Sequence, residues 1–241
     1  MNKARSRLIV AVDVPDRAAA LAAIGRLSGH VGCFKLGLEI FVREGPTLVN
    51  EIVGRGEKVF LDLKLHDIPN TVAGAVRSAC RLGIGMLTLH AAGGRKMLEA
   101  ACEAAQGSSS PPLLLAVTAL TSLTPDDAHS IGVQYPIPGW VERLAEVACQ
   151  AGIRGLVASS HELSNLHSKF GGRMQFVIPG IRPRGAPSQD QARTATPADA
   201  IRAGADYIVV GRPILQAPDP ALAADQIVAE IAAGLSKKEK P

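Results

Sequence analysis

The chain has 241 residues and a formal net charge of +4, and 47% of its residues are hydrophobic. This length suits one α/β barrel or two small domains, and the hydrophobic content excludes an intrinsically disordered chain. Aromatic residues make up only 3% of the chain, which leaves little material for base stacking, so we expect no nucleic-acid partner. No apolar run reaches the roughly 18 residues that cross a bilayer, and we therefore expect no membrane partner.

The cysteine pattern indicates the redox compartment. The chain contains 4 cysteines with no C-x-x-C pair, namely Cys33, Cys80, Cys102 and Cys149. Cysteines scattered through apolar and alanine-rich stretches are typical of reduced thiols that pack as small hydrophobic side chains. We therefore predict a cytoplasmic protein. The first apolar run ends early, at Asp13, and is interpreted as a strand rather than a signal peptide.

Short β-branched runs alternate with alanine-rich helical patterns along nearly the whole chain. The predicted strands, in chain order, cover 8–13, 31–37, 58–64, 85–90, 113–120, 155–159, 175–180 and 207–212. Helical patterns between them include 16–27, 71–83, 140–152 and 196–204. The last of these opens with Thr196 as the N-cap and Pro197 at the first helical position, and it closes on Gly204.

This alternation predicts the fold class. Eight strand–helix units are typical of a closed parallel (β/α)8 TIM barrel, and we expect residues 1–241 to form a single domain. The first strand is followed by Asp13-Val14-Pro15-Asp16 rather than G-x-G-x-x-G, which argues against a doubly wound nucleotide-binding sheet. The basic segment at about 236–241 is expected to be a short flexible tail.

Polar residues gather where the predicted strands end. They are Asp13, Lys35, Asp62, Lys64, His90, Thr121, Arg182 and Arg212. The carboxyl ends of barrel strands carry the active site in enzymes of this fold. We therefore expect these residues to surround a functional site.

The segment 60–71 reads FLDLKLHDIPNT and concentrates charge. Because strand side chains alternate, Asp62 and Lys64 are expected on one enclosed face, where they must pair with each other or face a ligand. Asp67 follows in the loop, and Lys35 comes from the preceding strand. One interpretation is an ion pair that closes the barrel mouth. The other is an alternating Lys/Asp array that suits a decarboxylation, in which negative charge leaves one position and appears at another.

The last two strands indicate a phosphate site. They end in Pro179-Gly180-Ile181-Arg182 and Val210-Gly211-Arg212, and barrel loops after strands 7 and 8 frequently bind phosphate. Gly180 and Gly211 permit close backbone approach, and Arg212 offers a bidentate guanidinium. The alternative is that the glycines are turn residues and Arg212 is a surface charge. The polar stretch 182–193 is expected to be a long mobile loop that closes over an anion, with Gln191 as a further donor.

Together these residues resemble the orotidine 5′-phosphate decarboxylase family. The resemblance rests on DLKLHDIPNT with AVD at the first strand, FKLG at the second, LTS after the fifth, PGIRP at the seventh and VGRPI at the eighth. It extends from about Leu8 to Leu215. It implies decarboxylation of orotidine 5′-phosphate to UMP, the last step of de novo pyrimidine biosynthesis, with no cofactor and no metal.

The resemblance also implies residue roles. Lys64 would protonate the C6 carbanion, Asp62 would lie against the substrate carboxylate, and Lys35 and Asp67 would complete the array. The residue matching Asp67 is contributed across a dimer interface, which implies a homodimer with active sites at the interface. The implied substrate-binding residues are Asp13 and Lys35 at the ribose, Ile68 and Thr71 beside Asp67, Thr121 and Ser122 at the pyrimidine, and Arg182, Gln191, Gly211 and Arg212 at the phosphate.

Two other functions remain open from the residues. A Mg²⁺-dependent sugar-phosphate decarboxylase or aldolase of the same barrel superfamily also carries D-x-K-x-x-D, but it has a carboxylate where this chain has Lys35, and a lysine would repel the metal. A non-enzymatic phosphate-ligand-binding barrel would not explain a buried Lys/Asp alternation. His66 is expected to have a packing or loop role, whereas His90 either supports the structure or lies near the site.

Overall fold

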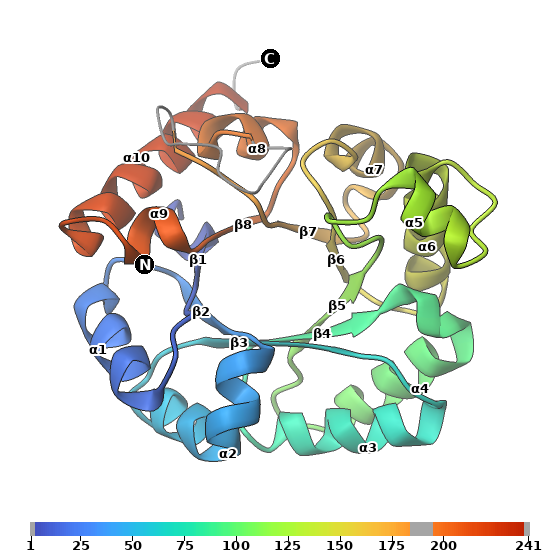
Figure 1. Ribbon diagram of the computed structural model, residues 1–241, viewed down its shortest axis with the longest axis horizontal. Helices are drawn as coiled ribbons and strands as arrows, with labels where there is room; N and C mark the ends of the chain where they lie inside the picture. The colour runs from blue at the N-terminus through green and yellow to red at the C-terminus, as the bar shows by residue number, and fades with distance from the viewer. Residues whose placement is uncertain (1–2, 184–194, 239–241) are drawn as a thin grey trace.

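The eight strands pair in parallel in chain order, and the last closes on the first to form a barrel. The computed structural model describes residues 3–183 and 195–238. Seen along the barrel axis, the helices form a ring around the strands (Figure 1). The predicted (β/α)8 TIM barrel is confirmed.

All of the predicted strands and helices are present within the described residues. The strands are β1 (Leu8–Ala11), β2 (Cys33–Leu36), β3 (Val59–Leu65), β4 (Met86–His90), β5 (Leu113–Val117), β6 (Gly155–Val157), β7 (Gln175–Ile178) and β8 (Tyr207–Val210). The helices are α1 (Arg17–Leu27), α2 (Leu38–Gly54), α3 (Pro69–Cys80), α4 (Gly94–Gln106), α5 (Pro125–Ser130), α6 (Ile137–Gln150), α7 (Leu163–Phe170), α8 (Pro197–Ala203), α9 (Arg212–Leu215) and α10 (Pro220–Lys238), with 3₁₀ turns η1 (Arg5–Arg7) and η2 (Ala91–Gly93).

Local sequence signals explain where helices begin and end. Thr196 caps α8 by accepting a hydrogen bond from the Asp199 backbone N–H at 3.2 Å, with Pro197 at the first helical position, as predicted. Gly204 ends the helix at a φ of 114°, a left-handed conformation that glycine adopts without a steric penalty. The last helix, α10, continues to Lys238, and residues 239–241 of the predicted tail lie outside the described residues.

Each strand buries both of its faces. Outward side chains such as Val10, Phe34 and Leu61 pack in the core between barrel and helices. The inward side chains that fill the barrel are Ile9, Ala11, Cys33, Phe60, Met86, Leu115, Val177 and Val209. This double burial explains why the strands are continuous apolar runs rather than alternating ones.

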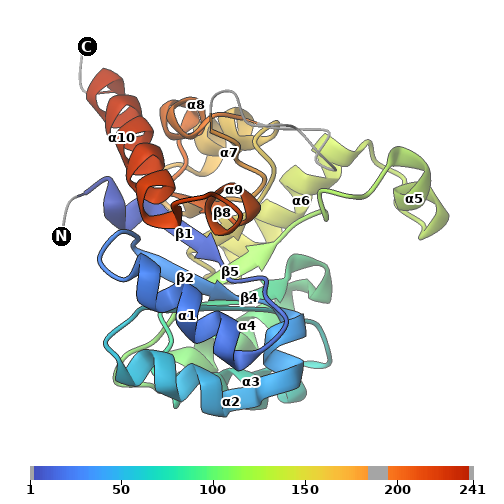
Figure 2. The same ribbon diagram turned by 60° about the vertical axis from the view of Figure 1, so that its left-hand side comes forward.

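Three further features of the described residues bear on the sequence predictions. The segment after β5 carries α5, which stands apart from the barrel wall (Figure 2). The cysteines Cys33, Cys80, Cys102 and Cys149 are all free. Within residues 3–183 and 195–238, no helix has the length and apolar character needed to cross a membrane.

Candidate active site

Charged residues reach the barrel mouth because the alternation that fills the barrel continues to the strand ends. In β2 the inward-facing Cys33 is followed two positions later by Lys35, and in β3 Phe60 is followed in the same way by Asp62. The same spacing leads from inward-facing Ala11 to Asp13 just beyond β1. These side chains therefore share the carboxyl edge of the barrel, where enzymes of this fold carry their active sites.

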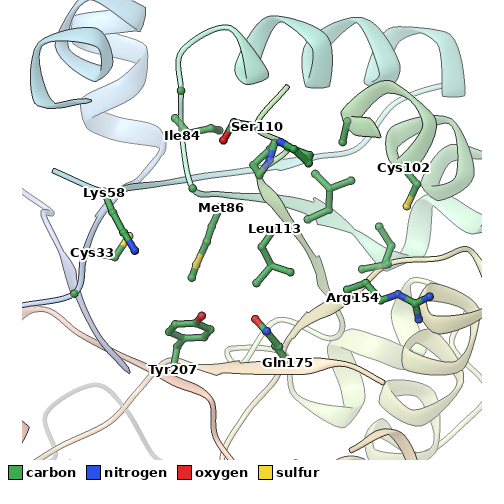
Figure 3. Close-up of a pocket in the computed structure, with 18 of the residues that line it drawn as sticks. Cys33, Lys58, Ile84, Met86, Cys102, Ser110, Leu113, Arg154, Gln175 and Tyr207 are labelled. Carbon is green, nitrogen blue, oxygen red and sulfur yellow. The ribbon is translucent and has the colours of Figure 1, made fainter. Parts of the chain in front are cut away.

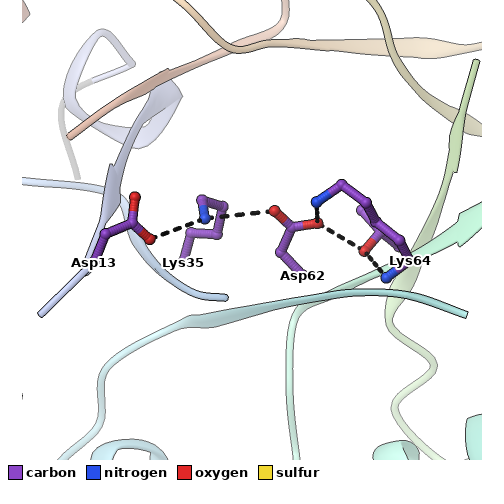
Figure 4. A network of polar contacts seen from close by, with 5 residues as sticks. Asp13, Lys35, Asp62 and Lys64 are labelled. Carbon is purple, nitrogen blue, oxygen red and sulfur yellow. Dashed lines mark hydrogen bonds and ion pairs between the residues drawn. The ribbon is translucent and has the colours of Figure 1, made fainter. Parts of the chain in front are cut away.

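Four of the predicted site residues form a chain of alternating charge across this mouth (Figure 4). Lys35 Nζ lies 3.5 Å from Asp13 Oδ1 and 3.4 Å from Asp62 Oδ2. On the other side, Lys64 Nζ donates a hydrogen bond of 2.9 Å to Asp62 Oδ1. The structure thus brings Asp13, Lys35, Asp62 and Lys64 together, and we call these four residues the charge array.

Asp62 is the centre of the charge array, with its side chain only 12% exposed. Burial alone would raise the pKa of Asp62, but the charges of Lys35 and Lys64, with hydrogen bonds from Lys64 and Thr88, outweigh burial and hold the pKa below its ordinary value. The carboxylate is therefore ionised at neutral pH, between two cationic side chains.

The strand that carries the motif departs from regular pairing at this point. The register between β3 and β4 shifts between Leu61 and Leu65, so that residues 62–64 lie opposite Thr88. Within the described part of the chain, Lys64 is the one non-glycine residue with a positive φ, at 50°. This left-handed conformation costs an L-residue roughly 1–2 kcal/mol and is the kind of strain that gathers at functional sites. The bulge, rather than the regular alternation predicted from the sequence, therefore aims the Lys64 side chain.

Thr88 is a site residue that the sequence analysis did not identify. Its side chain is 1% exposed, and its Oγ1 accepts a hydrogen bond from the Lys64 backbone N–H and donates one to Asp62 Oδ1, each 2.9 Å long. The alternation of side chains along β4 could have identified Thr88. Thr88 follows the inward-facing Met86 by two positions, just as Asp62 follows Phe60.

His66, inside the motif, and His90, at the end of β4, lie side by side with ring centroids 5.5 Å apart. Burial, and to a lesser extent the charges of His66 and Lys64, lower the pKa of His90 below its ordinary value, although Asp62 acts in the opposite direction. His90 is therefore neutral at pH 7. Of the two roles that the sequence left open for His90, its electrostatic contact with Lys64 and Asp62 favours a position near the site.

The loop after β3 presents the remaining residues of the motif to solvent. Asp67, Ile68 and Thr71 are all exposed, and the Asp67 carboxylate accepts a hydrogen bond of 2.6 Å from the Ile68 backbone N–H. Within the described residues, the ion pairs of the charge array do not include Asp67. The array is therefore assembled in one chain without this carboxylate.

The predicted phosphate residues follow β7 and β8. Gly180 has a φ of 77°, and a Cβ added at Gly211 would lie 3.4 Å from Ala11 Cβ, which is an ordinary van der Waals contact. Arg212 opens α9 and is exposed, whereas the Arg182 side chain is only 8% exposed. Of the two arginines, Arg212 is the one that a ligand in solution reaches directly.

The residues on either side of the predicted mobile loop pair with each other. Ile181 and Ala195 form a parallel bridge, and the Arg182 backbone N–H donates to the Ala195 carbonyl oxygen at 3.0 Å. Gln191 and the rest of 184–194 lie outside the described residues. Thr121 and Ser122, the predicted pyrimidine contacts, are exposed in a turn between β5 and α5.

A cavity of about 690 Å³ lies at the opposite, amino-terminal mouth of the barrel. Cys33, Met86, Leu113, Gln175 and Tyr207 line it from the first residues of their strands (Figure 3). Burial raises the pKa of the Cys33 thiol to about 12, which makes it a poor nucleophile at neutral pH. Glu57, Lys58 and Arg154 also line this cavity, but the ion pairs around the largely buried Asp62 lie at the carboxyl mouth. Among the residues that the structure describes, no three His, Cys, Asp or Glu side chains group as metal ligands.

A closed parallel barrel whose carboxyl mouth holds Lys and Asp side chains around the largely buried Asp62 has the architecture of a TIM-barrel enzyme. Comparison with known proteins narrows this class. The model of the orotidine 5′-phosphate decarboxylase / HUMPS family matches residues 6–227, and the chain belongs to this family.

Individual relatives match over nearly the whole chain. The chain is 47% identical to orotidine 5′-phosphate decarboxylase of Moorella thermoacetica over 95% of this chain and 93% of that protein. It is 48% identical to the protein of the same name from Syntrophotalea carbinolica over 98% of both chains. Among solved structures, orotidine 5′-phosphate decarboxylase from Lactobacillus acidophilus superposes with a TM-score of 0.85 at 36% identity, covering 93% of this chain and 98% of that one.

Proposed function

We propose that this chain decarboxylates orotidine 5′-phosphate to UMP, the last step of de novo pyrimidine biosynthesis. The observation that carries the proposal is the position of Asp62, buried and ionised between the ammonium groups of Lys35 and Lys64. Family membership and near-complete coverage by decarboxylase relatives support the same activity.

The chemistry follows from this charge distribution. The bond between C6 of the pyrimidine and its carboxylate breaks, CO₂ leaves, and the electron pair remains on C6. The Lys64 ammonium stabilises this carbanion electrostatically and then transfers a proton to C6, which yields UMP and a neutral amine that is reprotonated from solvent. Asp62 lies against the substrate carboxylate, and Lys35 balances the charge of Asp62. No residue in this scheme requires a cofactor.

The non-reacting parts of the nucleotide provide the binding energy. Asp13 and Lys35 bind the ribose hydroxyls, and Thr121 and Ser122 contact the pyrimidine. Gly211 and the exposed Arg212 bind the phosphate, together with Arg182 and Gln191 from the loop after β7. The phosphate lies far from the bond that breaks. Its binding energy therefore serves to orient the pyrimidine against Lys64.

The exposed loop after β3 supports a homodimer with active sites at the interface. Ile68 is 67% exposed, and exposed apolar side chains also occur early in α2, where Leu38 is 53% and Val42 is 81% exposed. Burying these residues against a second copy would carry Asp67 and Thr71 to the partner's site. The free thiols of all the cysteines support a location in the cytoplasm.

A Mg²⁺-dependent sugar-phosphate enzyme is the competing function, since the family includes more than one activity. Lys35 argues against it, because its ammonium lies 3.4 Å from Asp62 Oδ2 and a divalent cation at this carboxylate would be repelled. A phosphate-binding barrel without catalysis would have no use for a largely buried carboxylate held between two lysines.

A single assay separates these functions. The loss of orotidine 5′-phosphate absorbance is followed with the purified protein, with and without a strong chelator. Turnover that the chelator does not change is expected. Turnover that requires Mg²⁺ would support the sugar-phosphate class, and tight binding of the nucleotide without turnover would support the binding protein.

A further inference from the structure

One hydroxyl group ties the two central residues of the charge array together. The Lys64 backbone N–H donates to Thr88 Oγ1, and Thr88 Oγ1 donates to Asp62 Oδ1. The same carboxylate oxygen also accepts the hydrogen bond from Lys64 Nζ. These three groups therefore close a ring of hydrogen bonds through the side chain and the backbone of Lys64.

The direction of each hydrogen bond in this ring follows from which groups can donate. Because the Lys64 backbone N–H can only donate, Thr88 Oγ1 must accept there, and its own proton is then directed to Asp62. The Thr88 side chain is 1% exposed, so water does not replace either bond. Its hydroxyl is thus held in one orientation.

The irregular backbone of residues 62–64 explains why the Thr88 hydrogen bonds are needed. Residues 62–64 bulge out of the ladder with β4, and Lys64 is held at a φ of 50°. Thr88 is the residue of β4 opposite this bulge, and its hydroxyl takes the hydrogen bond from the Lys64 N–H. Without it, the strained segment would lose a specific contact that keeps it from relaxing toward an ordinary strand.

We propose that Thr88 is a positioning residue for the decarboxylation, which holds Lys64 and Asp62 in their relative geometry through its hydroxyl. This proposal rests on the proposed function. Thr88 acts through Lys64 and Asp62 rather than on the substrate. Its loss therefore affects the chemical step and leaves in place the ribose contact of Asp13 after β1 and the phosphate contacts of Gly211 and Arg212 after β8.

The test compares three variants at this position. Thr88→Val keeps the shape and removes the hydroxyl, Thr88→Ser keeps the hydroxyl, and Thr88→Ala differs from the serine variant by the hydroxyl alone. We expect Thr88→Val and Thr88→Ala to lower kcat by about 10- to 100-fold, the scale of a misplaced catalytic group, with KM near the wild-type value. Thr88→Ser is expected to keep most of the wild-type kcat.

Thr118→Val is the matched control. Thr118 is also a buried threonine, 2% exposed, but its hydroxyl donates to the Val157 carbonyl oxygen at 3.2 Å and does not touch the charge array. This variant is expected to lose thermal stability to a similar degree as Thr88→Val while its kcat stays near wild type.

The outcomes separate the two proposals. Absence of decarboxylation in the wild-type protein would overturn the proposed function. If the wild type turns over but Thr88→Ala matches Thr88→Ser in kcat, or if Thr118→Val loses as much kcat as Thr88→Val, the positioning role is overturned. The serine–alanine pair decides the question even if Thr88→Val does not fold.

Discussion

The ammonium of Lys35 lies 3.4 Å from Oδ2 of Asp62, on a neighbouring strand and on the opposite carboxylate oxygen from the one that Lys64 engages. Both oxygens of one buried carboxylate are thus occupied by cations. An anionic group brought beside Asp62 meets two attractive charges and one repulsive charge. This arrangement favours a reaction that removes the anion next to Asp62 and creates a new one next to Lys64.

The first prediction concerns proton donation. Lys64→Ala should lower kcat by at least about 10²- to 10⁴-fold, the contribution of a positioned general acid, because C6 loses both its proton source and the nearest positive charge. Turnover is measured by the absorbance assay and folding by circular dichroism. Lys58→Ala is the control, since Lys58 is exposed at the opposite mouth of the barrel. Substantial turnover by a folded Lys64→Ala protein would rule out the proton-donor role.

The second prediction concerns pH. Lys35→Ala removes the leading charge that lowers the pKa of Asp62, so the pKa rises and the acid limb of the kcat profile moves to higher pH. An unmoved acid limb would show that Lys35 does not control this carboxylate.

The same carboxylate makes stability depend on pH. Because the folded-state pKa of Asp62 lies below the ordinary aspartate value of 3.8, the folded protein binds fewer protons than the unfolded chain in this range. The stabilisation from Asp62 is therefore fully present above pH 3.8 and is lost as the pH falls through the folded-state pKa. Urea unfolding in a series of acidic buffers should show a smaller acid-dependent loss for Asp62→Asn than for wild type.

The third prediction concerns phosphate. Arg212→Ala should weaken binding of the phosphorylated nucleotide by roughly 10- to 100-fold, since hydrogen bonds to charged groups contribute about 1.5–3 kcal/mol. Binding of the unphosphorylated nucleoside should change little. Calorimetric titration of both ligands measures the difference, and Arg202→Ala, an exposed arginine that pairs with Asp199, is the control. Equal losses for both ligands would exclude a phosphate contact.

The fourth prediction concerns assembly. Ile68→Asp places a charge on a side chain that is 67% exposed in the single chain and that we expect to be buried in the dimer. Sedimentation velocity should show a monomer. The absorbance assay should show a reduced kcat, because the partner's Asp67 would be absent from the active site. Leu222→Asp, at a 55% exposed position in α10, should leave both mass and kcat unchanged. A variant Ile68→Asp that remains dimeric would place the interface elsewhere.

Much of the architecture followed from local patterns. The strand runs, the Thr196 cap and the Gly204 terminus are local signals whose physical basis is complete within a few residues, and each is present in the structure. The gathering of Asp13, Lys35 and Asp62 was also predictable, because parallel strands share one carboxyl edge.

Other parts of the site depended on pairing between distant strands. Thr88 was not identified, since a threonine inside an apolar strand is ordinary and its role appears only when β4 lies against the bulge of β3. The exposure of Asp67 and the burial of Arg182 were likewise invisible in the motif, because each depends on what the surrounding loops cover.

The sequence by itself determined the barrel and the composition of its charged mouth, because strand alternation and strand order are properties of the chain alone. Only the tertiary structure decided how those charges are aimed. The left-handed backbone of Lys64 and the hydroxyl of Thr88 that meets it belong to neighbouring strands. Their relationship exists only once the register between those strands has formed.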